Sequence, residues 1–415
     1  MPWRTCDAME LKRDFVELAC REGANVRGLC RRFGISAPTG YKWLARHRAG
    51  EGLGERSRRP ERSPGRTSAE MEGKIVAARA EHPAWGGRKL KRWLENRGET
   101  GVPAAGTITG VLRRHGLLGE PAGPSGGGWR RFERETPNEL WQIDYKGWIP
   151  VASGGRCHPL TMLDDHSRYN LLLEACRGET FRELRPLLEG AFARHGLPRA
   201  LLCDNGAPWG NSEGHFTACE AWLLRLGVEV LHGRPRHPQT QGKEERFHRT
   251  LKAELLSRAT EWRDLGHCGE SFARWREIYN HERPHEALGG AVPASRYRTS
   301  ERVMPKRVPE AGEWYGGSDV VKRVKSKGEI TFHNVSWNIG AAFRGQEVAL
   351  RQTGEQRWEV YYCWKKIGVA DHGARQGKPK VCYEQMAERS LGRRAADPRA
   401  DPRPGESVND VPEQV

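Results

Sequence analysis

Residues 136–147 read TPNELWQIDYKG, and this stretch sets the expectation for the fold. Its apolar run from about Leu140 to Gly147 predicts a short β-strand. Further elements are expected in chain order: strands at 157–163 and 169–175, a helix at 180–195, a strand at 200–203, a helix at 214–226, a strand at 228–231, and helices at 242–257, 272–280 and 293–297. Strands followed by alternating helices and strands predict a mixed sheet with helices on its faces.

One acidic residue lies within an expected strand, and another directly follows an expected strand. Asp144 lies inside the first one, where a carboxylate is costly to bury unless it is paired or bound to a metal ion; an outward-facing strand position is the alternative. Asp204 directly follows the apolar strand Ala200-Leu201-Leu202-Cys203. It therefore emerges at the strand's carboxyl end, where open α/β sheets place ligands. An ordinary Asp-Asn-Gly turn is the alternative for Asp204.

A third acid begins a helix in HPQTQGKEERFHRTL, residues 237–251. A loop rich in Pro, Gln and Gly leads into this helix and places Glu245 in its first turn. His248, Arg249 and Lys252 follow at helical spacing, which predicts one polar, basic stripe beside the acid. The neighbouring Glu244 competes with Glu245 on spacing alone, and a solvated helix face with ordinary ion pairs is the alternative for the whole segment.

Three separated acids of this kind suit phosphodiester chemistry. Two divalent cations about 3.5–4 Å apart activate the attacking oxygen and neutralise the leaving one. Mg²⁺ prefers carboxylate and water oxygens, so acids at strand ends are its expected ligands. The ten cysteines are scattered without any CxxC pair, which favours reduced thiols over a disulfide framework or a cysteine-bound zinc ion.

The N-terminal region is expected to form a helix-turn-helix. Apolar residues repeat at helical spacing in two segments: Leu11, Phe15 and Leu18, then Val26, Leu29, Cys30 and Phe33. Ser36 is a natural N-cap for a helix at about 37–48. That helix carries Thr39, Lys42 and Arg46 opposite a packed face of Tyr41 and Leu44, so it could lie in a major groove. A plain three-helix bundle is the alternative.

The chain is expected to divide into several domains and linkers. The expected segments are a helix-turn-helix domain at 1–50, a basic linker at 51–68, a second helix-turn-helix or winged-helix-like domain at 69–120 (helices at about 69–80, 87–97 and 104–115), a linker at 121–134, a catalytic core at 135–300, a linker at 301–317, a small β-barrel at 318–372 and a disordered tail at 373–415. Within the β domain, 330–337 is expected to be one strand.

Charge points to the kind of partner. The 415 residues include 69 Lys and Arg against 53 Asp and Glu, a net charge of +16. Such a surplus favours a polyanion, and nucleic acid is the commonest one; a solvated basic surface is the alternative. Neither a long apolar run nor an apolar N-terminal signal is present, so we expect a cytoplasmic protein without membrane contact.

Five motifs together suggest a family. They are TPNELWQIDYKG (136–147), LDDHSRY (163–169), LLCDNGAPW (201–209), HPQTQGKEERFHRTL (237–251) and YNHERPHEALGGAVPASRY (279–297). In this order they resemble the catalytic core of the retroviral-integrase superfamily, specifically that of bacterial insertion-sequence transposases. The resemblance implies an RNase H-like fold with Asp144, Asp204 and Glu245 as its acid triad.

The resemblance also implies an activity. The three acids would hold two Mg²⁺ ions, with Mn²⁺ as a substitute, and the protein would free 3′-OH ends at terminal inverted repeats and join them to target DNA. Joining two ends of double-stranded DNA implies a homo-oligomer, at least a dimer, acting at the bacterial nucleoid. The residues expected to contact DNA are Thr39, Lys42, Arg46, Gln239, Gln241, Lys243, Arg246, Arg249 and Lys252.

Several features depart from the family pattern or leave alternatives. The separation between Asp204 and Glu245 exceeds the family's usual one, so a longer loop is expected near 209–214. The family places its acid three residues after Gly242, which selects Glu245, and Asp164 and Asp165 are interpreted as structural or supporting. The alternatives to a transposase are a catalytically silent DNA-binding regulator derived from one, and a ribonuclease-H-type nuclease that only hydrolyses.

Overall fold

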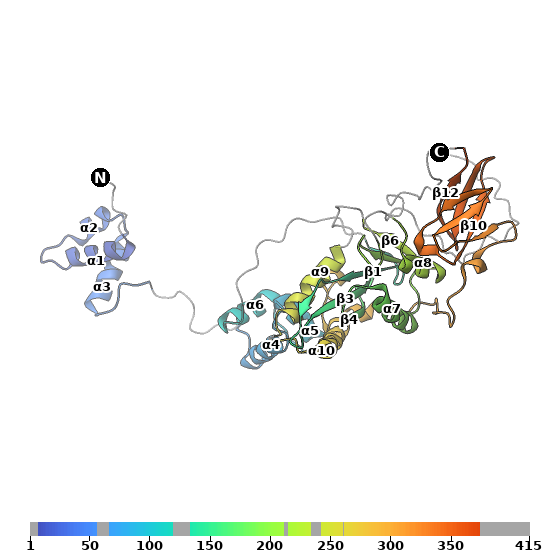
Figure 1. The fold of residues 1–415 in the computed structure, drawn as a ribbon. Helices are drawn as coiled ribbons and strands as arrows, with labels where there is room; N and C mark the ends of the chain where they lie inside the picture. The colour runs from blue at the N-terminus through green and yellow to red at the C-terminus, as the bar shows by residue number, and fades with distance from the viewer. Residues whose placement is uncertain are drawn as a thin grey trace, which may run out of the picture. The chain divides into compact units, whose positions relative to one another are not determined.

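The computed structural model describes residues 7–55, 66–118, 133–210, 215–233, 242–259 and 261–373. It divides into two compact units, Met1–Thr67 and Ser68–Val415 (Figure 1). Gln239, Gln241, the expected tail beyond Gly373, and most of the two expected linkers before the core lie outside the described residues.

The first unit contains three helices, α1 Ala8–Ala19, α2 Val26–Arg32 and α3 Ala37–Arg48. Ser36 caps α3 as the sequence predicts, because its side chain accepts a hydrogen bond from the backbone N–H of Thr39. The helices pack closely where α3 carries Gly40: a Cβ added there would lie 2.3 Å from the Cys30 sulfur. Glycine is thus required for this contact.

The packed face of α3 differs from the expected one. Tyr41 is 48% exposed and does not pack inward, whereas Trp43 is buried beside Leu44. Gly40, Trp43 and Leu44 follow the i, i+3, i+4 spacing of one helix face, and this face meets the buried side of α1. Leu11 of α1 is exposed for a similar reason, since Phe15 and Val16 occupy the core.

The second unit begins with three more helices, α4 Ala69–Glu81, α5 Gly87–Asn96 and α6 Ala105–Arg114. They surround a buried cluster that includes Ile75, Leu90, Trp93 and Ile108. The expected helices at 69–80, 87–97 and 104–115 are therefore confirmed.

A mixed sheet forms the centre of the second unit (Figure 1). Its strands are β1 Leu140–Tyr145, β2 Ile149–Pro150, β3 Arg156–Asp164, β4 Asn170–Cys176, β5 Ala200–Cys203 and β6 Glu229–His232. The order is β2-β3-β1-β5-β6, with β4 paired to β3. β1 runs antiparallel to β3 and parallel to β5, and β5 runs parallel to β6. The expected mixed α/β core, RNase H-like in kind, is confirmed.

Helices cover this sheet through two buried clusters. One cluster joins the central strands to α7 Phe181–His195 and α8 Ala218–Arg225. The other joins β3 and β4 to α9 Gly242–Leu251 and α10 Leu265–Glu277. The expected helix at 242–257 ends as a π-helix, η2 Lys252–Leu256, and a second π-helix, η3 Ile278–Glu282, follows α10.

α10 begins earlier than the expected 272–280. Asp264 accepts a hydrogen bond from the backbone N–H of His267 and so caps the new start. A 3-10 turn, η4 Glu286–Leu288, follows η3, and another at Pro293–Ser295 stands where a helix at 293–297 was expected.

The C-terminal domain is made of β7 Val320–Arg323, β8 Glu329–Phe332, β9 Val335–Asn338, β10 Glu347–Gln352, β11 Arg357–Tyr362 and β12 Lys365–Asp371. A four-stranded sheet, β12-β11-β10-β7, accompanies the hairpin β8-β9. The expected single strand at 330–337 is wrong, because His333 and Asn334 both adopt positive φ (47° and 60°) and reverse the chain.

This β domain is anchored on the core. Trp364 donates its indole N–H to the carbonyl of Leu224 at 3.2 Å, and Lys365 pairs with Glu229 at 2.6 Å. Ala221 and Leu224 of α8 belong to the β domain's buried cluster. The two domains therefore share apolar surface.

Candidate active site

Strand register brings Asp144 and Asp204 to one edge of the sheet. Leu140 pairs with Ala200 and Gln142 with Leu202, in parallel. Asp144 lies two residues beyond Gln142, and Asp204 two residues beyond Leu202. Neighbouring parallel strands therefore deliver both carboxylates to the same end.

The two acids interact electrostatically. The pKa of Asp144 is raised to about 7, first by burial and then by the negative charge of Asp204. A cation bound between them would favour the ionised form of Asp144. The edge therefore offers carboxylate oxygens with the electrostatics that a divalent metal ion requires.

Trp209 positions the second acid. Asp204 accepts hydrogen bonds from the indole N–H of Trp209 at 2.5 Å and from the backbone N–H of Gly206 at 2.9 Å. Trp209 is only 1% exposed and stacks on Tyr145, with ring centroids 5.2 Å apart. The sequence pattern alone does not predict this role, although a tryptophan five residues after the acid in a polar loop is a usable signal.

Helix α9 presents two adjacent glutamates in different surroundings. Glu244 is fully buried and accepts a hydrogen bond from the Thr161 hydroxyl at 3.1 Å. His248 lies between this pair and Asp144, with Nε2 2.8 Å from the Thr161 hydroxyl and Nδ1 3.8 Å from Asp144. Glu245 is exposed at the next position of the helix. The structure thus places Glu244, and not Glu245, within the buried surroundings of Asp144.

The predicted triad is not drawn together into one tight group. Among the described residues, one group of three metal-ligating side chains has ligand atoms within 4.8 Å of one another. It consists of Glu81, His82 and Glu282 and includes none of the three predicted acids. Asp144 and Asp204 share the sheet edge, whereas Glu245 is an exposed residue of α9. Their carboxylates, which are partly or largely exposed, suit Mg²⁺ because this ion keeps several waters.

The basic stripe of α9 differs from the expected one. His248 is 8% exposed, and burial lowers its pKa to about 3, so the ring is neutral. Lys243 pairs with Asp165 at 2.5 Å, and burial lowers its pKa to about 8. Arg246, Arg249 and Lys252 remain exposed. Helical spacing alone does not reveal that α9 packs with His248 toward the sheet.

Asp164 and Asp165 agree with their interpretation as structural residues. Both are buried. Asp165 accepts hydrogen bonds from the Gln142 amide at 2.6 Å and from the backbone N–H of Arg134 at 2.8 Å. These contacts join the segment before β1 to the end of β3.

A Glu244→Gln substitution should change how stability depends on pH. Burial, and then the charge of Asp144, raise the pKa of Glu244 well above its usual range. The folded state then keeps a proton that the unfolded chain releases near pH 4.3. Wild-type stability should therefore fall as pH rises above this value, by up to about 1.4 kcal/mol per pH unit, whereas Gln has no proton to lose.

Urea or thermal unfolding from pH 5 to 8 in chelator measures this effect. The stability of Glu244→Gln relative to wild type should grow with pH. Glu245→Gln makes the same change at the exposed neighbour and should track the wild type. Parallel curves for Glu244→Gln and wild type would contradict the prediction.

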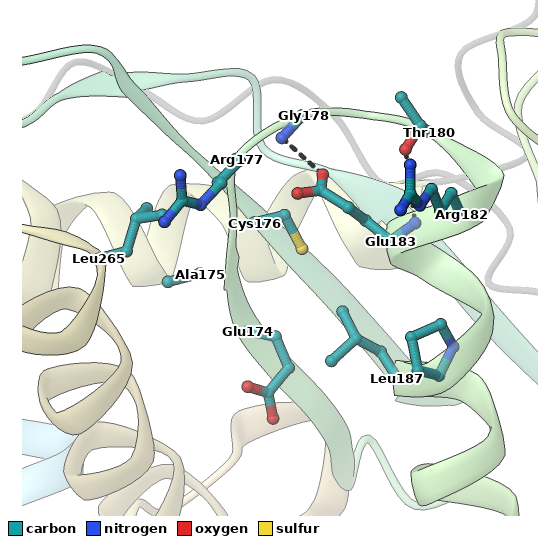
Figure 2. A pocket seen from close by; sticks show the side chains of 11 residues that line it. Glu174, Ala175, Cys176, Arg177, Gly178, Thr180, Arg182, Glu183, Leu187 and Leu265 are labelled. Atoms are coloured by element: carbon teal, nitrogen blue, oxygen red, sulfur yellow. Dashed lines mark hydrogen bonds between the residues drawn. The ribbon is translucent and has the colours of Figure 1, made fainter.

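A separate hollow of about 820 Å³ lies between β4 and α7 (Figure 2). Its lining includes Cys176, Arg177, Arg182 and Leu265, together with Glu183, which accepts a hydrogen bond from the backbone N–H of Gly178 at 2.8 Å. None of the three predicted acids lines it.

Sequence families match most of the folded regions. Residues 134–238 and 226–293 match families described as "Integrase core domain", and residues 39–112 match "Homeodomain-like domain". Residues 319–378 match "IS481 family transposase, C-terminal domain". Together with the insertion-element relatives described next, these matches support a bacterial insertion-sequence transposase. The homeodomain-like match confirms the expected helix-turn-helix character of the N-terminal helices.

Individual relatives cover parts of this chain. A protein of insertion element IS476 from Xanthomonas euvesicatoria is 29% identical over 182 residues, which are 43% of this chain and 50% of that protein. A protein of insertion element IS407 from Burkholderia multivorans is 28% identical over 160 residues, 38% of this chain and 55% of that protein. The chain thus spans about half the length of these curated relatives.

Two solved structures are similar to this chain at 15% identity. A chain of the simian T-cell lymphotropic virus intasome covers 74% of this chain and 99% of its own length, with a TM-score of 0.34. The HTLV-2 integrase catalytic core, solved with magnesium, covers 40% of this chain and 99% of its own length, with a TM-score of 0.30.

Across the described residues, no helix has the length and apolar character needed to cross a membrane.

Proposed function

We propose that this transposase cleaves the ends of its mobile element to free 3′-OH groups and joins them to target DNA. The observation that carries the proposal is the shared edge of β1 and β5, where the charge of Asp204 raises the pKa of Asp144. Carboxylates coupled in this way in an integrase-type sheet suit divalent metal ions and phosphoryl transfer.

Glu245 is proposed as the third ligand. A Mg²⁺ site keeps several waters, so its ligands need access to solvent, and Glu245 is exposed whereas Glu244 is fully buried. Glu244 would instead support the site through Thr161. Two Mg²⁺ ions, or Mn²⁺ in their place, would supply charge neutralisation at the attacking and leaving oxygens.

The basic helices are proposed to hold the DNA. Arg246, Arg249 and Lys252 line the exposed side of α9 and suit phosphates beside the cut. Thr39, Lys42 and Arg46 of α3 would contact the terminal inverted repeats, and Gln239, Gln241 and Lys243 the DNA near the cut. Lys243 would first have to leave Asp165.

The assembly and its location follow from this activity. Joining two ends requires two active sites, so we propose a homo-oligomer, at least a dimer, on double-stranded DNA. Its substrate would place the protein in the bacterial cytoplasm at the nucleoid.

A joining assay tests the function. Labelled DNA ends from the element are incubated with supercoiled plasmid and full-length protein in Mg²⁺ or Mn²⁺. We expect labelled plasmid that depends on the metal ion and is absent with scrambled ends. Specific binding without nicking would indicate a catalytically silent regulator, and nicking without joining would indicate a nuclease; either result would refute the proposal.

A further inference from the structure

A buried histidine lies where the helices α4, α5 and α6 meet the core. His82 directly follows α4 and is 6% exposed. Its ring stacks on Trp85, with centroids 3.7 Å apart and planes at 7°, and meets the edge of Trp93 at 5.0 Å. The ring nitrogen Nε2 has no hydrogen-bond partner. Leaving a buried polar atom unsatisfied is unfavourable, so this nitrogen is suited to a ligand that the protein alone does not supply.

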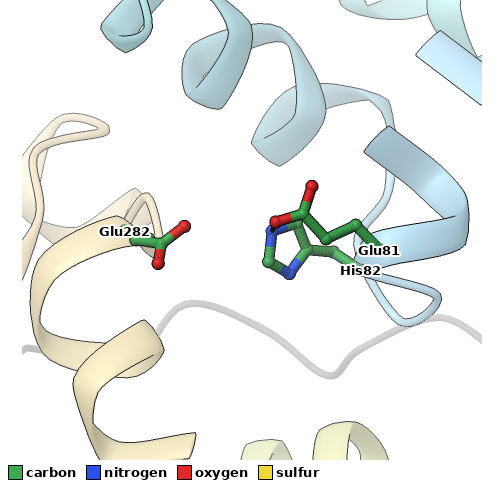
Figure 3. Close-up of side chains that lie close together, drawn as sticks. All are labelled: Glu81, His82 and Glu282. Carbon is green, nitrogen blue, oxygen red and sulfur yellow. Dashed lines mark ion pairs between the residues drawn. The ribbon is translucent and has the colours of Figure 1, made fainter. Parts of the chain in front are cut away.

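Two carboxylates lie next to this nitrogen (Figure 3). Glu81 is the last residue of α4, and Glu282 is the last residue of η3 in the core. One ligand atom from each of Glu81, His82 and Glu282 lies within 4.8 Å of the other two. The distance between Glu81 Oε1 and His82 Nε2 is 3.6 Å, which is too long for a hydrogen bond.

The spacing suits a small metal ion. Zn²⁺ binds imidazole nitrogen and carboxylate oxygen at about 2.0–2.2 Å, which separates ligand atoms in a tetrahedral site by about 3.3 Å. Small rotations of the two glutamate side chains would reach this spacing. His82 is already held in place by Trp85 and Trp93, so its nitrogen is preorganised.

We propose that Glu81, His82 and Glu282 bind one divalent transition-metal ion of the Zn²⁺ class, with water completing the coordination. Imidazole favours Zn²⁺ over Mg²⁺, which prefers all-oxygen surroundings. Two carboxylates offset the positive charge of Arg97, whose guanidinium lies 3.8 Å from Glu282.

Such an ion would connect two parts of the chain. Glu81 and His82 belong to the helical unit, whereas Glu282 belongs to the core. The same junction already contains Ile278, packed against the helical unit's buried cluster, and an ion pair between Arg88 and Glu286 at 2.6 Å. The metal site itself is independent of the proposed function, but its use in holding a DNA-recognition unit beside the catalytic edge rests on that function.

Zinc binding by the full-length protein tests the site. The protein is stripped with chelator and dialysed against Zn²⁺ in millimolar Mg²⁺, which is added to compete for the carboxylate edge at Asp144. Bound zinc and thermal unfolding are then measured. We expect a zinc equivalent that raises the unfolding temperature, and Co²⁺ in its place should give visible absorption from the imidazole-bound ion.

Two matched variants decide the outcome. Glu282→Gln should weaken zinc affinity at least about ten-fold and abolish the rise in unfolding temperature. Glu286→Gln makes the same change four residues later at an exposed ion pair and should retain both. Neither glutamate belongs to a buried cluster, so both variants should fold. Equal zinc binding by the two variants, or none by the wild type, would overturn the site, and both readouts are independent of DNA joining.

Discussion

The Asp144→Asn and Asp204→Asn variants should each lose the proposed strand-transfer activity by on the order of a thousand-fold or more. Asparagine keeps the size of the side chain but removes the negative charge that a divalent cation needs. The two carboxylates share one sheet edge, and the pKa of Asp144 responds to Asp204, so neither can replace the other. Initial rates of joined product formation, with labelled ends and plasmid target, measure the loss.

The same assay assigns the third ligand. Glu245→Gln should match the loss at the two aspartates, whereas Glu244→Gln should retain more activity because its side chain is buried behind the edge. Binding to element ends should survive in all four variants, since their DNA-contacting helices are unchanged. Full activity in Asp144→Asn and Asp204→Asn would refute the catalytic assignment, and a larger loss in Glu244→Gln would transfer the ligand role to Glu244.

Asp164→Ala should destabilise the core by about 3–5 kcal/mol. Asp164 is fully buried, and its carboxylate accepts hydrogen bonds from the backbone N–H of Asn138 at 2.7 Å and of Ser167 at 2.7 Å. It also accepts one from the Ser167 hydroxyl at 2.6 Å. Alanine leaves these buried donors without an acceptor, and an unsatisfied buried donor adds its desolvation free energy to the loss of the hydrogen bond.

Urea unfolding at pH 7 compares the variants. Asp164→Asn keeps one acceptor oxygen and should fall between wild type and alanine. The exposed Glu135→Ala, in the segment before β1, should change stability by less than about 0.5 kcal/mol. An alanine variant at position 164 as stable as the wild type would show that these contacts do not support the core.

The sequence predicts most of this fold because its hydrophobic pattern and its turn and capping residues indicate the same element boundaries. Apolar runs such as Ala200–Cys203 end in turn residues, and Ser36 caps α3 where expected. The errors arise where neighbours in space decide. Trp43 and not Tyr41 is buried, because Gly40 lets α3 approach Cys30 closely. The chain reverses at His333 without a glycine, the residue that would most clearly predict a turn there.

The candidate site was likewise predicted only in part from the sequence. Strand ends predict that Asp144 and Asp204 meet, because parallel neighbours share an edge. Spacing cannot show which side of α9 packs inward, so the buried positions of Glu244 and His248 were not foreseen. The partnership of Trp209 with Asp204 depends on a loop conformation that no periodic pattern encodes.

The anchoring of the β domain on α8 limits how this protein can be shortened. A fragment that ended before β7 would leave Leu224 and Ala221 facing water and Glu229 without Lys365. Such a fragment would expose an apolar surface that is buried in the full chain, and this surface would promote self-association. Loss of the β domain would therefore impair the folding of the integrase-like core, which gives selection a physical reason to keep both domains on one polypeptide.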